Sequence, residues 1–389
     1  MITLTSRASG RGALWLCYGG MMCLAVAVNL APVYLTTFSE TFGGAMGLTN
    51  EQLGRIPAIT FVGLVLGILI SGPLADRWGA KTFSLIGLAL TCAGLALLGV
   101  AGRYETLLAS GAILGLGAGI IDMVMSPIVS ALVPDRRASA LNWLHSFYCL
   151  GAVATTSIAS GALALGVSWR AVAFSMIALP ALLVVGFVPA RIPPLVHEEA
   201  SRDPVSRLLR QPLFIAALVA ILLAGATEVG LAQWLPAYTE RHLGYSKAAG
   251  AMALAGFSVG MVMGRMLAGS LGHRTNPISL VAVSCCVTAA LFLVGCFSPY
   301  GPLALAACVA VGFTSSCIWP TLLGITADRF PHGGASMFGL LAAAGNIGCF
   351  IMPWLVGVLS EKTDLAYGLA SITACPALLL AIVAWMRRR

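Results

Sequence analysis

Charged residues are scarce in this sequence. Only 9% of the 389 residues are Asp, Glu, Lys or Arg, whereas 59% are hydrophobic and the mean hydropathy is +0.94. A soluble domain carries about 25% charged residues, and one globular core cannot bury this much apolar surface. We therefore expect lipid, rather than water, to surround most of the chain.

Motifs for ATP hydrolysis and for zinc catalysis are also missing. The sequence contains no GxxxxGK[ST] phosphate-binding loop, which argues against an ATP-driven pump, and no HExxH zinc motif. The eleven cysteines lie almost entirely within apolar runs and form no CxxC pair, which is typical of small packing residues. We expect no enzyme activity, no cofactor and no metal site.

The apolar residues form twelve long runs separated by short polar breaks. A membrane-spanning helix needs about 20 apolar residues, and only helices satisfy their own backbone hydrogen bonds in lipid. The first run is too long for the core of a signal peptide. The predicted spans are 13–38, 52–75, 82–101, 106–133, 140–165, 169–189, 212–240, 247–271, 277–297, 301–327, 335–359 and 363–386.

Basic residues are distributed unequally between the two sets of connecting loops. The net charge is +8, which in a soluble protein would suggest nucleic acid, but here the positive-inside rule accounts for it. One set holds sixteen of the 22 Lys and Arg residues, and the other holds Arg55, Arg103, Arg170, Arg241, Lys247 and Lys362. This asymmetry predicts a multi-pass inner-membrane protein with both termini in the cytoplasm and no nucleic-acid partner.

The two halves of the chain resemble each other. The longest polar stretch, 190–211, separates six spans in 1–189 from six in 212–389, and we interpret it as a cytoplasmic linker between two bundles. An offset of 193 maps Pro127 and its following Asp-Arg pair onto Pro320 and Asp328-Arg329, and it also maps three glycines. Such a repeat predicts an all-α transporter with two pseudo-symmetric six-helix bundles and a midplane solute site.

The loop between spans 2 and 3 carries a recognisable motif. Residues 72–81, Gly-Pro-Leu-Ala-Asp-Arg-Trp-Gly-Ala-Lys, resemble the signature of the major facilitator superfamily. The resemblance implies alternating access, and it implies that the motif residues control the conformational switch. Those residues are Gly72, Asp76, Arg77, Gly79 and Lys81.

Three shorter stretches resemble the fucose-permease-like branch of that superfamily. They are 119–127 in span 4, 141–151 in span 5 and 264–269 at the end of span 8. In that branch span 4 carries a Glu implicated in proton coupling, and it matches Asp122. Span 1 of the branch carries an Asp, which this chain lacks around Asn29, a departure that puts fucose itself in doubt.

Two of the fourteen acidic residues lie deep within spans. Asp122 is about 16 Å and Glu228 about 24 Å from the cytoplasmic face, at 1.5 Å of rise per residue. An acid at such depth is costly and usually marks a proton or substrate pathway, although a structural hydrogen bond is the alternative. His145, which titrates near neutral pH, is a third candidate for proton coupling.

Polar and aromatic side chains within the spans are candidate solute contacts, or else packing and interface residues. They are Asn29, Tyr34, Tyr148, Gln233, Trp234, Trp319 and Asn346. Arg265 and Arg170 lie near span ends, so no anion clamp is expected, and neutral or cationic solutes stay open.

Three functions are compatible with these features. The first is proton-coupled symport of a small polar solute such as a sugar, because burial favours the neutral form of a carboxylic acid and a proton on Asp122 would permit reorientation. The second is proton-coupled efflux of a cationic or amphipathic compound, with Asp122 and Glu228 as counter-charges. The third is a non-transporting membrane receptor. For a transporter we expect solute, protons and lipid as partners, and function as a monomer.

Overall fold

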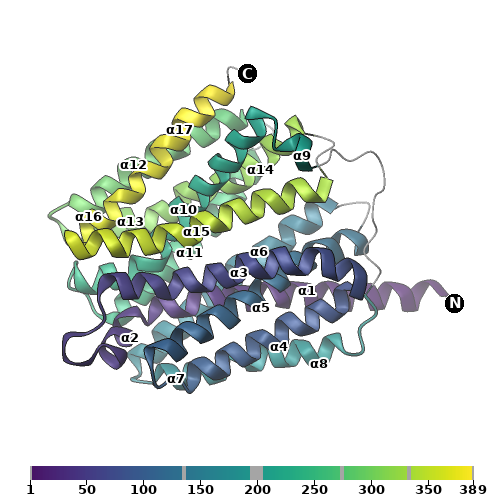
Figure 1. The fold of residues 1–389 in the computed structure, drawn as a ribbon, viewed down its shortest axis with the longest axis horizontal. Coiled ribbons are helices and arrows are strands. Elements are labelled where there is room, and N and C mark those ends of the chain that lie inside the picture. The colour runs from purple at the N-terminus through teal and green to yellow at the C-terminus, as the bar shows by residue number, and fades with distance from the viewer. Residues whose placement is uncertain (1, 134–136, 193–204, 272–275, 331–333, 388–389) are drawn as a thin grey trace. The chain divides into compact units, whose positions relative to one another are not determined.

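The computed structural model describes residues 2–133, 137–192, 205–271, 276–330 and 334–387, and Figure 1 shows their arrangement along the chain. The regular secondary structure in these ranges is helical throughout. The first half contains α1 (Ile2–Val33), α2 (Leu35–Phe42), α3 (Asn50–Trp78), α4 (Ala80–Gly99), α5 (Tyr104–Leu132), α6 (Arg137–Ala164), α7 (Trp169–Met176) and α8 (Ala178–Phe187).

The short helix α9 (Val205–Leu208) precedes the helices of the second half. These are α10 (Pro212–Arg241), α11 (Lys247–Leu271), α12 (Pro277–Phe297), α13 (Gly301–Ser315), α14 (Ile318–Arg329), α15 (Gly334–Lys362), α16 (Leu365–Ala370) and α17 (Ala374–Arg387). Residues 193–204 of the predicted linker lie outside the described ranges.

Within the described residues, twelve segments are long and apolar enough to cross a membrane. Each coincides with one of the predicted runs, so the prediction of twelve spans is confirmed. The segments are Arg11–Val33, Asn50–Ser71, Ala80–Gly99, Tyr104–Val129, Trp143–Ala164, Trp169–Phe187, Pro212–Arg241, Lys247–Ala268, Pro277–Phe297, Gly301–Arg329, Met337–Lys362 and Leu365–Arg387.

Three spans are interrupted shortly before a proline. The α7/α8 junction at Ile177 precedes Pro180, the α13/α14 junction at 316–317 precedes Pro320, and the α16/α17 junction at 371–373 precedes Pro376. Proline lacks an N–H and its ring clashes with the carbonyl four residues earlier, which disrupts the helical ladder there. At each junction a backbone carbonyl lacks its helical N–H donor and can accept a hydrogen bond from another group.

The helices form two compact units. One consists of residues 1–31 and 59–198, and the other of residues 32–58 and 199–389. Within the second unit the start of α3 packs on α15: the Asn50 amide donates to Glu361 Oε2 at 2.8 Å, and Trp354 Nε1 donates to Glu51 Oε1 at 3.0 Å. Residues 32–58 therefore pack with the second half of the chain, although the sequence assigns them to the bundle of residues 1–189.

Close helix crossings repeat at the offset seen in the sequence. A Cβ built on Gly119 of α5 would lie 2.0 Å from the Leu64 carbonyl oxygen of α3, and a Cβ on Gly312 of α13 would lie 2.3 Å from that of Phe257 on α11. The two contacts differ by 193 residues at both partners, so the predicted internal repeat is confirmed. Small residues at these points let the helix backbones approach closely.

Candidate functional site

Asp122 lies on the face of α5 that packs against α3. It follows Gly115 and Gly119 by about two turns and one turn, and a Cβ on either glycine would overlap the backbone of α3. The residue is partly buried, and its carboxylate has no hydrogen bond or ion pair among the described residues. The structure thus places an acid at the helix–helix seam without a counter-charge.

Two further predicted residues of the first unit lie close together. Asn29 of α1 is buried and its Nδ2 donates to the Ala25 carbonyl at 2.9 Å, with a longer contact of 3.5 Å to the Tyr148 hydroxyl of α6. His145 lies one turn before Tyr148 and is exposed. The structure therefore brings the predicted residues Asn29 and Tyr148 together. The side chain of His145 lies on the surface of the described structure.

Glu228 of α10 forms an ion pair with Arg265 of α11. Arg265 Nη2 lies 3.0 Å from Glu228 Oε1 and 3.3 Å from Oε2. The pair is largely enclosed, because 11% of the Glu228 side chain and 27% of the Arg265 side chain are exposed. Arg265 lies near a span end as expected, in the last two turns of α11, but its guanidinium reaches the largely buried Glu228.

Arg265 also binds the interrupted helix of span 10. Its Nε donates to the Ser316 carbonyl at 3.3 Å, and Ser316 precedes Pro320 by four residues. In an uninterrupted helix the amide of residue 320 would occupy that carbonyl, but proline has no N–H to donate. Pro320 therefore exposes an acceptor that the guanidinium satisfies.

Trp319 packs against α10 one turn away from Glu228. The Trp319 ring rests on two glycines, because a Cβ on Gly225 would lie 2.9 Å from Trp319 Cζ3 and a Cβ on Gly345 only 2.0 Å from Cη2. Gly225 precedes Glu228 by three residues and also borders Cys349. Asn346, next to Gly345, donates from Nδ2 to the Ala342 carbonyl at 3.0 Å.

Three predicted solute contacts are enclosed in the second unit. Trp234 is fully buried, and its Nε1 donates to the Pro353 carbonyl of α15 at 2.9 Å, which is a helix-packing contact. Gln233 and Tyr34 are 1% exposed. Their role as solute ligands stays a prediction.

Residues 72–81 comprise the last turns of α3, the turn at Gly79 and the start of α4. Gly79 has a φ of +86°, which favours glycine, and its amide closes the end of α3 by donating to Ala75 at 2.9 Å. Lys81 Nζ donates to the Val188 carbonyl at 2.6 Å and so caps the end of α8. The surroundings of Gly72 and the side chains of Asp76 and Arg77 lie outside the described part of the structure.

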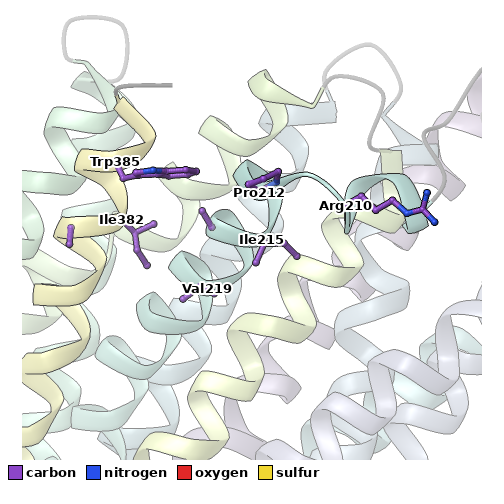
Figure 2. A pocket seen from close by; sticks show the side chains of 8 residues that line it. Arg210, Pro212, Ile215, Val219, Ile382 and Trp385 are labelled. Atoms are coloured by element: carbon purple, nitrogen blue, oxygen red, sulfur yellow. The ribbon is translucent and has the colours of Figure 1, made fainter.

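A groove with a volume of about 620 Å³ runs between α10 and α17, as Figure 2 shows. Ile215 and Val219 line it from α10, and Ile382 and Trp385 from α17, with Arg210 and Pro212 at its end. It contains none of the predicted site residues. Its apolar lining is what a lipid-facing surface between two spans is expected to have.

Residues that could hold a metal are not gathered in the described ranges, which contain no cluster of three His, Cys, Asp or Glu side chains. The sequence did not predict the contacts of Arg265 with Glu228 and with the Ser316 carbonyl. Two features pointed to them: Glu228 required a partner within the bilayer, and Pro320 left a carbonyl without its helical donor.

Comparison with known proteins gives a consistent result. A profile of the family described as Major Facilitator Superfamily matches residues 13–353 and 241–389. The chain is 26% identical over 350 residues to a probable nitrate/nitrite transporter of Mycobacterium tuberculosis, with 85% of each chain covered. It is 23% identical over 373 residues to the cis,cis-muconate transport protein of Acinetobacter baylyi, covering 89% of this chain and 87% of the relative.

Solved structures share the fold. The fucose–proton symporter of Escherichia coli superposes with a TM-score of 0.67 at 20% sequence identity, covering 96% of this chain and 98% of the symporter. With twelve membrane-spanning segments and an internal repeat, the likeness shows a twelve-helix transporter fold.

Proposed function

Because the chain belongs to the major facilitator superfamily, we propose that it moves a small polar solute across the inner membrane by alternating access, in symport with protons. The observation that carries the coupling step is the position of Asp122, an acid within a membrane span with no counter-charge among the described residues.

The charged form of Asp122 is costly within a membrane span. An ionised Asp at the centre of a spanning helix costs about 2.5–3.5 kcal/mol on insertion scales. A basic partner would offset this cost, but none contacts Asp122 in the described part of the chain. A proton removes the charge, so protonation and deprotonation change which conformations of the carrier are favourable.

The other two acid–base candidates are placed differently. Glu228 is held by Arg265, so its ionised form is already compensated. His145 is exposed at the start of span 5, on the surface of its helix, whereas Asp122 is partly buried at a helix seam. Asp122 is therefore the preferred coupling residue of the three.

The proposed setting in the cell follows from the charge distribution. The excess of Lys and Arg in one set of loops supports cytoplasmic termini and insertion in the inner membrane. The repeat supports two six-helix bundles, 1–189 and 212–389, that rock about a linker at 190–211, with the motif at residues 72–81 controlling the switch and a monomer as the working unit.

Membership of the fucose-permease-like branch is the finer part of the proposal. The match of Asp122 to the acid of that branch supports it, and so do the stretches at 119–127, 141–151 and 264–269. The substrates named for two sequence relatives are nitrate, nitrite and cis,cis-muconate, which broadens the solute class from sugars to small anions.

The test uses Asp122→Asn in proteoliposomes, with a solute found by ligand-induced thermal shifts across a library. Asn resembles a protonated Asp but exchanges no proton. We expect the variant to lose accumulation driven by a pH gradient and to retain counterflow exchange, because exchange requires only reorientation of the loaded carrier.

Glu105→Gln is the matched control, since Glu105 is an exposed acid in the first turn of the same helix. It should transport like wild type. Wild-type accumulation by Asp122→Asn would contradict the proposal and would direct attention to Glu228.

A further inference from the structure

The Glu228–Arg265 ion pair carries an inference about the solute. Resting on the proposed proton-coupled transport, we infer that Arg265 is the binding group for a small planar oxyanion, either an organic carboxylate or an inorganic anion, and that Glu228 occupies Arg265 until a proton and the solute arrive.

The geometry of the pair is that of a bound carboxylate. One guanidinium nitrogen of Arg265 contacts both oxygens of Glu228, at 3.0 and 3.3 Å. A planar guanidinium recognises carboxylates and related oxyanions through charge-assisted hydrogen bonds. Glu228 therefore shows, with a group of the protein itself, how the oxyanion of a solute would bind.

Access differs between the two partners. Arg265 exposes 27% of its side chain, whereas Glu228 exposes 11%. A solute can thus approach the cation more easily than the acid. The hydrogen bond from Nε to the Ser316 carbonyl fixes the guanidinium at the break of span 10, so that Arg265 stays in place when Glu228 withdraws.

Protonation of Glu228 links its release from Arg265 to the binding of the anion. If an anion displaces Glu228 from Arg265, the ionised Glu228 is left without its partner in a largely enclosed site, and such a charge is strongly disfavoured. Protonation of Glu228 removes that charge. The groups close enough to interact electrostatically with Glu228 include Arg265 on α11, Cys317 at the break of span 10 and Cys349 on α15, of which Arg265 is the only base.

The neighbouring aromatic surface restricts the shape of the solute. Trp319 is half-buried and contacts Gly225, which lies one turn before Glu228, and Gly345 on α15. The apolar carbon frame of a planar organic anion can pack against such a ring while its oxygens meet the guanidinium. The anions named for two relatives, nitrate and cis,cis-muconate, have this planar character.

The experiment measures binding by calorimetry on the purified full-length protein, at mildly acidic and at mildly alkaline pH. The probes are benzoate, nitrate and cis,cis-muconate, and benzamide serves as the neutral counterpart of benzoate. Wild type should bind at least one anion more tightly at acidic pH and should bind benzamide weakly. Benzoate or muconate binding without nitrate binding assigns organic carboxylates, and the reverse assigns inorganic anions.

The key variant is Glu228→Gln, which keeps the shape and removes the competing charge. We expect its anion affinity at alkaline pH to rise about tenfold, to the level of the acidic wild type, and to lose most of its pH dependence. The double variant Glu228→Gln with Arg265→Gln carries no unpaired buried charge, so it should fold but bind none of the anions. Glu105→Gln should match wild type.

Three outcomes would overturn the inference: benzamide binding as tight as benzoate binding, no anion binding by a folded Glu228→Gln protein, or anion binding by the double variant. These outcomes are separate from the test of Asp122. If Asp122→Asn still accumulates solute, the proposed coupling residue is wrong while the anion site stands. If folded Glu228→Gln binds no anion, the anion site is wrong while Asp122 stands as the coupling residue.

Discussion

The two acids within the membrane spans, Asp122 and Glu228, differ in what surrounds them. Asp122 lies at a seam of glycines between α5 and α3 and has no counter-charge among the described residues, whereas Glu228 faces Arg265, which is itself anchored to Ser316. A guanidinium compensates the acid in one unit, and under the proposed function a proton compensates the acid in the other. We therefore expect the partner, rather than the depth, to decide which acid exchanges protons in the absence of solute.

The largest effect is expected from removing one member of the ion pair. Arg265→Gln leaves Glu228 ionised and largely buried, so we expect a loss of about 3 kcal/mol in the free energy of unfolding, the lower end for a broken buried pair because Arg265 is partly exposed. Denaturant unfolding in detergent measures it. Adding Glu228→Gln should recover most of the loss.

Asp122→Asn provides the contrast to that result. Because Asp122 has no ionic partner in the described structure, its neutralisation should change stability little or raise it. If Asp122→Asn destabilised the protein as much as Arg265→Gln, the two sites would be equivalent and the comparison would fail.

A smaller effect is expected at the glycines that the two units share through the repeat. Gly119→Ala and Gly312→Ala each place a Cβ within about 2 Å of a carbonyl oxygen of the neighbouring helix, so each should cost about 1–3 kcal/mol in unfolding free energy. Similar losses would show that the scaffold is alike in both units and that the charges alone differ. A loss at only one glycine would show that the packing differs as well.

The smallest effect concerns the break in span 10. Pro320→Ala restores the N–H that can bond the Ser316 carbonyl and so competes with Arg265 Nε for the same acceptor. We expect stability to change by about 1 kcal/mol or less, the net worth of one hydrogen bond. Pro127→Ala at the equivalent position of α5 is the control, and anion binding should weaken only in the Pro320 variant.

The fold was predictable because it depends on local features of the chain. Apolar run length sets the spans. Pro127 and Pro320, with the glycines at the same offset, reveal the repeat, and the contacts of Gly119 and Gly312 confirm it. The interruptions before Pro180, Pro320 and Pro376 could not be located from proline alone, because Pro127, Pro236 and Pro353 lie inside helices that continue.

The site was predictable only in part. Asp122 and Glu228 were found because depth along a helix can be counted and a buried acid is costly. Arg265 was not, because its distance from a span end gives the position of its backbone, whereas its long side chain and the packing of α11 decide where the charge lies. The burial of Trp234 against Pro353 likewise depends on tertiary packing that sequence spacing does not contain.

The most direct test of the central claim is infrared difference spectroscopy of the solute-free protein between acidic and alkaline pH, which detects the carbonyl band of a protonated carboxylic acid. The account predicts that wild type shows a band that titrates, that Asp122→Asn loses it, and that Glu228→Gln keeps it. A band that persists in Asp122→Asn and disappears in Glu228→Gln would contradict the account, because the paired acid would then be the one that exchanges protons.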